Sequence, residues 1–181
     1  RRSGFELRFI ELTKSGELDM ASANTVIDES TAIVSFASVA NSLGSTSPVK
    51  NIIAIAKKFD ALTIVDAAQS IAHTPTDLRT LGCDFMVFSG HKMYGPTGIG
   101  VLYGKKECLH DLQPVFYGGG MIENVSYDRA LWRGIPHRFE PGTPNIAGAI
   151  GLSAAAKFIS SIGWENILKH EHDVIRYFFE K

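Results

Sequence analysis

Residues 85–100 read Phe-Met-Val-Phe-Ser-Gly-His-Lys-Met-Tyr-Gly-Pro-Thr-Gly-Ile-Gly, an apolar segment that runs directly into a lysine surrounded by small residues. The apolar residues 85–88 predict a buried strand that ends at Ser89. The glycines predict a tight turn toward a further strand at residues 99–103. A solvated surface charge is a poor explanation for Lys92 in this setting, so we expect it to belong to a site.

An upstream segment, Val65-Asp66-Ala67-Ala68-Gln69, has the same arrangement of an apolar strand followed by polar residues. Short apolar runs alternate with helical patterns along the chain, which favours an α/β fold with a mostly parallel sheet covered by helices. The expected strands are residues 32–36, 62–65, 85–88 and 99–103. Because ligands bind at the edge where parallel strands end, we expect Asp66 and Ser89 to face one crevice.

Two Ser/Thr-Pro pairs predict helix starts. Ser47-Pro48 and Thr143-Pro144 are each expected to supply an N-cap and a first helical residue. The second of these helices is rich in small residues and is expected to end near Gly163. Residues 114–138 have a weaker pattern that fits either a hairpin or an ordered loop.

The composition excludes several classes of protein. Hydrophobic residues make up 45% and charged residues 20% of the 181 residues, which indicates a soluble globular protein. A net charge of −1 gives no basic field for nucleic acid and no polybasic membrane patch. The apolar runs are too short to span a bilayer. Two cysteines, Cys83 and Cys108, suit a reducing compartment such as the cytoplasm, or an organelle matrix.

A lysine paired with an upstream acid is what a pyridoxal phosphate (PLP) enzyme requires. Lys92 would hold PLP as an imine and would then move protons at the substrate carbon, a role for which we expect it to be desolvated. Asp66 would keep the pyridine nitrogen protonated. Each residue has a simpler alternative, since aspartate is a common helix N-cap and lysine is usually a surface residue.

Four further side chains fit the same site. Gln69 and Asn41 would donate hydrogen bonds to the ring hydroxyl oxygen. Ser89 and His91 would meet the phosphate, together with backbone donors of the glycine-rich turn. The glycine spacing in residues 95–100 is a weak argument for a dinucleotide, because this segment precedes a strand and does not open a helix. The remaining histidines and the two cysteines do not have the spacing of metal ligands.

The motifs Val65–Gln69, Ser89–Gly100, Ala40-Asn41-Ser42-Leu43-Gly44 and Phe139-Glu140-Pro141-Gly142-Thr143-Pro144-Asn145 occur in this order and extend over nearly the whole chain. Together they resemble the cysteine desulfurases, which belong to the class V aminotransferase group of fold-type I PLP enzymes. The closest resemblance is to the Suf-type desulfurase and selenocysteine lyase branch.

The resemblance implies the roles given above for Lys92, Asp66 and the four further side chains. It also implies that Gly142 and Thr143 reach the phosphate of the neighbouring subunit, so we expect a homodimer; simple helix capping is the alternative for Thr143. The implied reaction removes sulfur from L-cysteine and leaves L-alanine and an enzyme persulfide. The sulfur would then pass to an acceptor protein for iron–sulfur cluster assembly.

The chain opens on Arg1-Arg2-Ser3-Gly4 without a methionine and closes inside an apparent helix. We therefore expect residues 1–181 to be the central part of a PLP-binding large domain. By the resemblance, an N-terminal part would supply a histidine that stacks on the ring and a phosphate loop. A C-terminal small domain would supply the persulfide-forming cysteine and the arginine that binds the substrate carboxylate.

Neither Cys83 nor Cys108 matches that persulfide-forming cysteine, so the segment alone is expected to have little activity. Two alternatives stay open. One is a selenocysteine lyase or another class V enzyme that acts on a different amino acid. The other is a non-catalytic remnant that keeps the fold without turnover.

Overall fold

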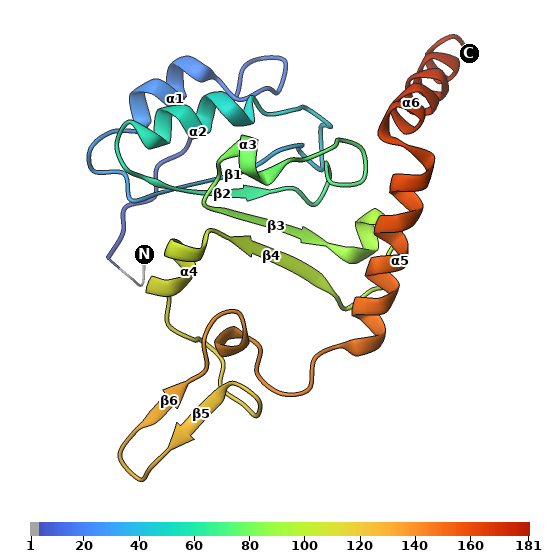
Figure 1. Cartoon of the computed structure of the whole chain (residues 1–181). Coiled ribbons are helices and arrows are strands. Elements are labelled where there is room, and N and C mark those ends of the chain that lie inside the picture. The colour runs from blue at the N-terminus through green and yellow to red at the C-terminus, as the bar shows by residue number, and fades with distance from the viewer. Residues whose placement is uncertain (1–3) are drawn as a thin grey trace.

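Four strands form one sheet in the order β1-β2-β3-β4 in the computed structural model, which describes residues 4–181 (Figure 1). β1 (Ile33–Ala37), β2 (Leu62–Asp66) and β3 (Phe85–Ser89) are parallel, and β4 (Gly100–Gly104) pairs with β3 in the antiparallel sense. The predicted mostly parallel α/β sheet is confirmed, and each strand begins within one residue of its expected start. Residues 1–3, on which the missing methionine was noted, lie outside the described residues.

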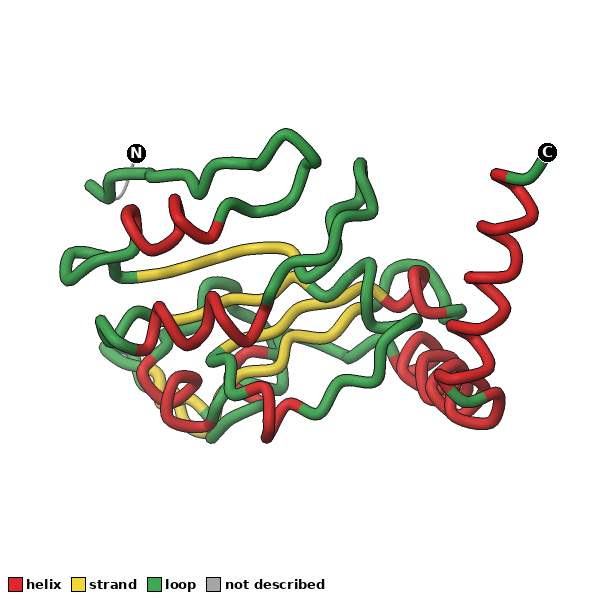
Figure 2. The backbone as a smooth tube through the Cα atoms, turned by 90° about the horizontal axis from the view of Figure 1, so that it is seen from above, coloured by secondary structure: helices red, strands yellow, loops and turns green. Residues whose placement is uncertain are grey.

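Helices and a hairpin surround this sheet. They are α1 (Met20–Val26), α2 (Val49–Lys57), α3 (Leu78–Leu81), the 3₁₀ helix η1 (Gly90–Met93), α4 (Lys106–Asp111), β5 (Ile122–Val125), β6 (Ala130–Trp132), the 3₁₀ helix η2 (His137–Phe139), α5 (Ile146–Ile162) and α6 (Trp164–Phe179). Figures 1 and 2 show α5 beyond the carboxyl end of β3, whereas the β5–β6 hairpin projects away from the sheet. The hairpin alternative for residues 114–138 is therefore correct.

The centre of the sheet is β2. Its last residue, Asp66, pairs with Ala37 of β1 and with Val87 of β3. The backbone N–H of Ala67 then donates to the carbonyl of Val87 at 2.9 Å. The carboxyl ends of all three parallel strands consequently share one edge of the sheet.

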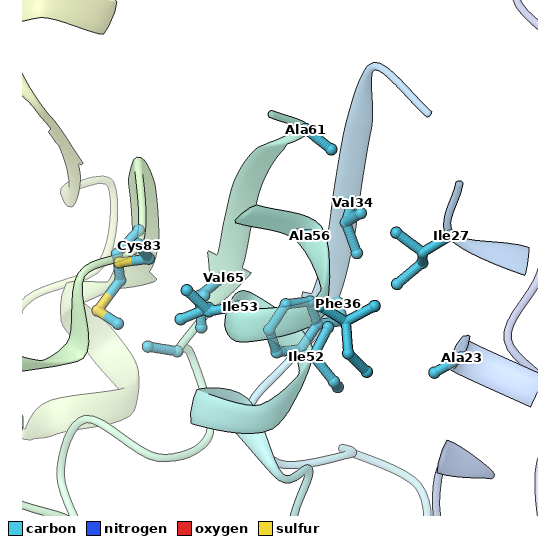
Figure 3. Close-up of a cluster of buried hydrophobic side chains, with 13 residues drawn as sticks. Ala23, Ile27, Val34, Phe36, Ile52, Ile53, Ala56, Ala61, Val65 and Cys83 are labelled. Atoms are coloured by element: carbon cyan, nitrogen blue, oxygen red, sulfur yellow. The ribbon is translucent and has the colours of Figure 1, made fainter. Parts of the chain in front are cut away.

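A first hydrophobic core lies between one face of the sheet and helices α1 and α2 (Figure 3). Phe36 of β1 and Val65 of β2 are register partners, so both point to this face. Ile52 and Ile53 of α2 are buried against them. Burial of each such side chain contributes about 1.5–3 kcal/mol, so this layer accounts for much of the folding free energy.

A second core joins α5 to the carboxyl edge of the sheet. Met93 of η1 and Ile159 of α5 are buried in it, together with Ala72 from the segment after β2 and Ile167 of α6. Phe88 of β3 packs against both cores. The end of β3 is thus held from two sides.

Both predicted helix starts are wrong by one or two residues. The Ser47 hydroxyl donates to the carbonyl of Ala37 at 2.6 Å, so it ties the loop to β1, and α2 begins one residue after Pro48. Thr143 does not cap α5 either. Asn145 does so, because its Oδ1 accepts from the N–H of Gly148 at 2.9 Å.

The second face of the sheet carries exposed apolar side chains. Ile33 and Leu62 are register partners and remain 51% and 39% exposed, and Leu102 of β4 is also exposed. Parallel sheets are normally covered on both faces.

In residues 4–181 no single helix is long and apolar enough to cross a membrane, although α5 and α6, bent by 77°, pass that test of length and composition as a pair.

A buried carboxylate connects three strands near the amino end of β2. Asp84 Oδ2 accepts from the N–H and the hydroxyl of Thr63, each at 2.8 Å, and Oδ1 accepts from Lys105 Nζ at 2.6 Å. Burial by itself raises the pKa of Asp84, but the hydrogen bonds from Lys105 and Thr63 outweigh it, so the pKa lies below its ordinary value.

Replacement of Asp84 by alanine is expected to lower the free energy of unfolding by roughly 2–4 kcal/mol at pH 7, because the N–H of Thr63 stays buried without a partner. Urea unfolding measures this. Since the folded-state pKa is lowered, the carboxylate stabilises the protein above its unfolded-state pKa. That contribution shrinks as the pH falls below about 4 and toward the lower folded-state pKa, so the difference in stability between the two proteins should narrow there.

The matched control is Asp28→Ala, which removes a half-exposed carboxylate bound to Arg8 and Ser30. It should lower the free energy of unfolding by less than Asp84→Ala does, because solvent screens this ion pair. Equal losses in the two variants at pH 7 would contradict the special role of Asp84.

Candidate functional site

Asp66 lies exposed at the end of β2, on the shared carboxyl edge. Its Oδ1 accepts from the N–H of Ala68 at 2.8 Å. The next helix after Asp66, α3, begins only at Leu78, so the alternative that Asp66 is a helix N-cap is wrong. The bond to Ala68 caps a turn instead, and it fixes the carboxylate so that Oδ2 is left for a ligand.

Gln69 and Asn41 meet beside this carboxylate. The Nε2 of Gln69 donates to the Oδ1 of Asn41. The Asn41 loop is closed by a hydrogen bond from the N–H of Ala40 to the carbonyl of Ser45 at 2.9 Å. Two residues assigned to one site from distant motifs are thus in direct contact, and the contact leaves the Nδ2 of Asn41 to donate elsewhere. Their donation to a ring oxygen stays a prediction.

Two serines that the sequence analysis missed support the same edge. Ser38 donates to the carbonyl of Asp66 from its N–H at 2.8 Å and from its hydroxyl at 2.9 Å. The hydroxyls of Ser38 and Ser70 lie 2.6 Å apart, and both residues are buried. Ser38 directly follows β1, but Ser70 lies in the turn after β2 and neither serine forms a motif, so no sequence signal identified them.

Lys92 and His91 lie on η1, directly after Ser89 at the end of β3. Both are exposed, whereas the next residue, Met93, is buried in the second core. We expected Lys92 to be desolvated. In the structure of residues 4–181 this expectation is wrong, because Met93 and not Lys92 is the buried residue of this turn. Tyr94 has a left-handed backbone, with φ of 61°, and ends the turn.

The lysine loop, residues 90–100, is closed by its own backbone. The N–H of Gly90 donates to the carbonyl of Ile99 at 2.8 Å, and the N–H of Gly95 donates to the carbonyl of Gly90 at 2.9 Å. The glycine-rich turn was expected to offer backbone donors to a phosphate, and these two amides are not available for that role because the loop uses them internally. Ser89 and His91 keep side chains that can donate.

Gly142 and Thr143 are exposed on the segment before α5. The N–H of Gly142 donates to the carbonyl of Gly119 at 2.7 Å. At the other end of the segment, the Nδ2 of Asn145 donates to the carbonyl of Gly98 in the lysine loop at 3.2 Å. The structure therefore brings this motif to the lysine loop of the same chain, while its contact with a neighbouring subunit stays a prediction.

Neither cysteine has the properties of an exposed thiolate. Cys83 is fully buried and Cys108 is half-buried. Burial raises the pKa of both thiols, which favours the unreactive protonated form. Within residues 4–181, no group of three or more His, Cys, Asp or Glu side chains could hold a metal ion.

The donor set on this edge consists of a carboxylate, an amide pair, a primary amine, a hydroxyl and an imidazole. These groups fit a compact polar ring with an anionic substituent, because both signs of charge and neutral donors lie on neighbouring strand ends. An exposed lysine on the same sheet edge, such as Lys92, can also bond covalently to a carbonyl carbon.

All 181 residues match the family model described as Aminotransferase class-V. The chain belongs to the class V aminotransferase family. Among curated class V relatives, a probable cysteine desulfurase of Streptomyces coelicolor is 47% identical over 177 residues, which are 98% of this chain and 42% of the relative. A probable cysteine desulfurase of Halalkalibacterium halodurans is 46% identical over the whole chain and 45% of its own length.

Solved structures agree with this class V assignment. The apo cysteine desulfurase from Thermococcus onnurineus superposes with a TM-score of 0.92 at 42% identity, over 98% of this chain and 44% of that one. The cysteine desulfurase CsdA from Escherichia coli gives a TM-score of 0.83 at 37% identity, over 87% of this chain and 39% of that one. The chain thus spans less than half the length of these relatives.

Gly90 is a position in the lysine loop where a side chain would clash with the other strand of the loop. A Cβ there would lie 2.9 Å from the Cγ2 of Ile99 and 3.0 Å from its carbonyl oxygen. Gly90→Ala is expected to lower the free energy of unfolding by about 1–3 kcal/mol through overpacking. The control Gly134→Ala, where no atom lies within 4 Å of the new Cβ, should change it by less than about 0.5 kcal/mol. Indistinguishable urea midpoints would show that the loop adapts freely.

Proposed function

We propose that the protein in its natural length is a PLP-dependent cysteine desulfurase, which converts L-cysteine to L-alanine and transfers the sulfur to an enzyme persulfide. The supporting observation is the position of Asp66, the Asn41–Gln69 contact and the lysine loop on one sheet edge. Relatives named cysteine desulfurase extend well beyond the matched region. We therefore also propose that residues 1–181 are the central part of the large PLP-binding domain.

Lys92 is proposed to attach PLP through its Nζ amine and later to move the α-proton of the substrate. Its exposure leaves the amine accessible, and the buried Met93 fixes the point from which the side chain extends. PLP, when bound, supplies an electron sink for the carbon that loses its proton. The role of the chain is to hold the amine within reach of that carbon.

Asp66 is proposed to accept a hydrogen bond from the protonated ring nitrogen. The Ala68 N–H occupies Oδ1, so Oδ2 is the oxygen assigned to this contact. An adjacent carboxylate favours the charged form of the nitrogen. Gln69 and Asn41 are proposed to donate to the ring hydroxyl oxygen, with the donor of Asn41 oriented by its bond to Gln69.

Ser89 and His91 are proposed to donate to the phosphate from the start of η1. Gly142 and Thr143 are proposed to reach the phosphate in the neighbouring subunit, which makes the enzyme a homodimer. These side chains are favoured over the glycine amides because the amides of Gly90 and Gly95 bond within the loop.

The sulfur is proposed to leave through an acceptor protein for iron–sulfur cluster assembly, in the cytoplasm or an organelle matrix. The exposed apolar face around Ile33 and Leu62 is proposed to be covered by the remainder of the enzyme. Assays of the natural-length protein for sulfide release from cysteine and selenide release from selenocysteine separate the two substrates within this reaction class.

The Lys92 assignment is tested by the visible spectrum of the natural-length protein with PLP, before and after borohydride. Wild type should show a bound-cofactor band that borohydride converts into a stable adduct on the peptide containing Lys92. Lys92→Ala should give no adduct, and Lys58→Ala, an exposed lysine at the end of α2, should behave as wild type. Identical uptake and trapping in the Lys92 variant would disprove the assignment.

Cys108→Ser should leave cysteine desulfurase activity within about twofold of wild type, because a half-buried thiol with a raised pKa is not the sulfur acceptor. The measurement is alanine formation with excess reductant, together with labelling of the persulfide. Loss of the persulfide signal in this variant would place the acceptor at Cys108 and contradict the proposal.

A further inference from the structure

Asn145 makes two hydrogen bonds that point in different directions. Its Oδ1 accepts from the N–H of Gly148 at 2.9 Å and so caps α5. Its Nδ2 donates to the carbonyl of Gly98 at 3.2 Å, across 47 residues of sequence. One side chain therefore connects the start of α5 with the lysine loop.

Two glycines of α5 make room for this connection. A Cβ on Gly148 would lie 2.5 Å from the Nδ2 and 2.7 Å from the Cγ of Asn145. A Cβ on Gly151 would lie 2.9 Å from the Cγ of Pro96 in the lysine loop. The small residues thus allow α5 to approach the loop closely and the amide of Asn145 to fold over the helix end.

The segment between Gly142 and Asn145 is consequently held at both ends. At one end, the N–H of Gly142 donates to the carbonyl of Gly119 at 2.7 Å. At the other end, Asn145, which lies two residues after Thr143, donates to the carbonyl of Gly98. Thr143, which is exposed between these two attachments, has its position set relative to the lysine loop. A helix cap alone would need only the Oδ1 of Asn145, so the second bond calls for a separate explanation.

We propose that Asn145 is a positioning residue, which fixes the Gly142–Thr143 segment relative to the lysine loop of its own chain so that Thr143 can donate to the cofactor phosphate bound in the neighbouring subunit. This inference rests on the proposed function, in which Thr143 contacts that phosphate. Asn145 acts through Thr143 and does not touch the cofactor. Its loss should therefore weaken the phosphate contact and leave the ring contacts of Asp66 in place.

The test is Asn145→Ser in the natural-length protein, titrated with PLP and with pyridoxal, which lacks the phosphate. Serine caps helices as well as asparagine does but is too short to keep the bond to Gly98. The dissociation constant for PLP should rise about fivefold, as for an ordinary hydrogen bond, and that for pyridoxal should change by less than about twofold.

The matched control is Asn24→Ser in α1, which removes an amide that donates to the carbonyl of Met20 at 2.7 Å, far from the lysine loop. It should leave both dissociation constants unchanged.

A second variant leaves Asn145 itself intact. Gly148→Ala improves helix propensity, but its Cβ must displace the Asn145 side chain and with it the cap of α5. PLP preference should therefore fall, while the melting temperature should change little because the two effects on stability oppose each other.

Equal weakening of PLP and pyridoxal binding, or wild-type binding of both in Asn145→Ser and Gly148→Ala, would overturn the positioning role. A wild-type protein that takes up no PLP would instead remove the proposed function, and this inference with it. The borohydride experiment on Lys92 identifies that second case independently.

Discussion

The backbone pairing of β2 with its two parallel neighbours is the constraint on which the rest of the structure depends. It sets Asp66 level with Ala37 and Val87, so that the segments leaving β1, β2 and β3 emerge at one edge. The loop with Asn41, the turn with Gln69 and the lysine loop are adjacent because of this register. At the other end of β2, the contacts of Asp84 join β2 to the residues that precede β3 and follow β4.

Close approach of backbone is the second requirement of the site. Gly90 contacts Ile99 across the lysine loop, and Gly151 contacts Pro96 between α5 and that loop. Side chains at these positions would separate the elements. Met93 then anchors the loop in the second core while Lys92 stays accessible, so rigidity and exposure occur in consecutive residues.

The sheet was predictable from sequence because its strands are short apolar runs with clear ends, as for residues 85–88. Asn41 and Gln69 could be assigned to one site because both follow strands, but their direct contact was not predicted. Local signals failed where a side chain had a better partner at long range. Ser47 resembles an N-cap, but its hydroxyl bonds to Ala37 ten residues away in sequence.

The exposure of Lys92 could not be predicted from the sequence. Lys92 and Met93 are consecutive residues of a 3₁₀ helix and point in different directions, and the orientation of this helix against the second core decides which of them is buried. The buried Ser38–Ser70 pair was likewise missed, since its two members lie in different connections and neither forms a motif. Such features depend on tertiary contacts, which the sequence encodes only through the completed fold.

The antiparallel direction of β4 has a consequence for binding. Because β3 ends and β4 begins at the same edge, the lysine loop starts and finishes on paired residues, Ser89 and Gly100. A loop closed in this way has already lost most of its conformational entropy on folding, and ordering it around a ligand would cost little more. Little of the binding free energy at this edge would therefore be spent on ordering the loop.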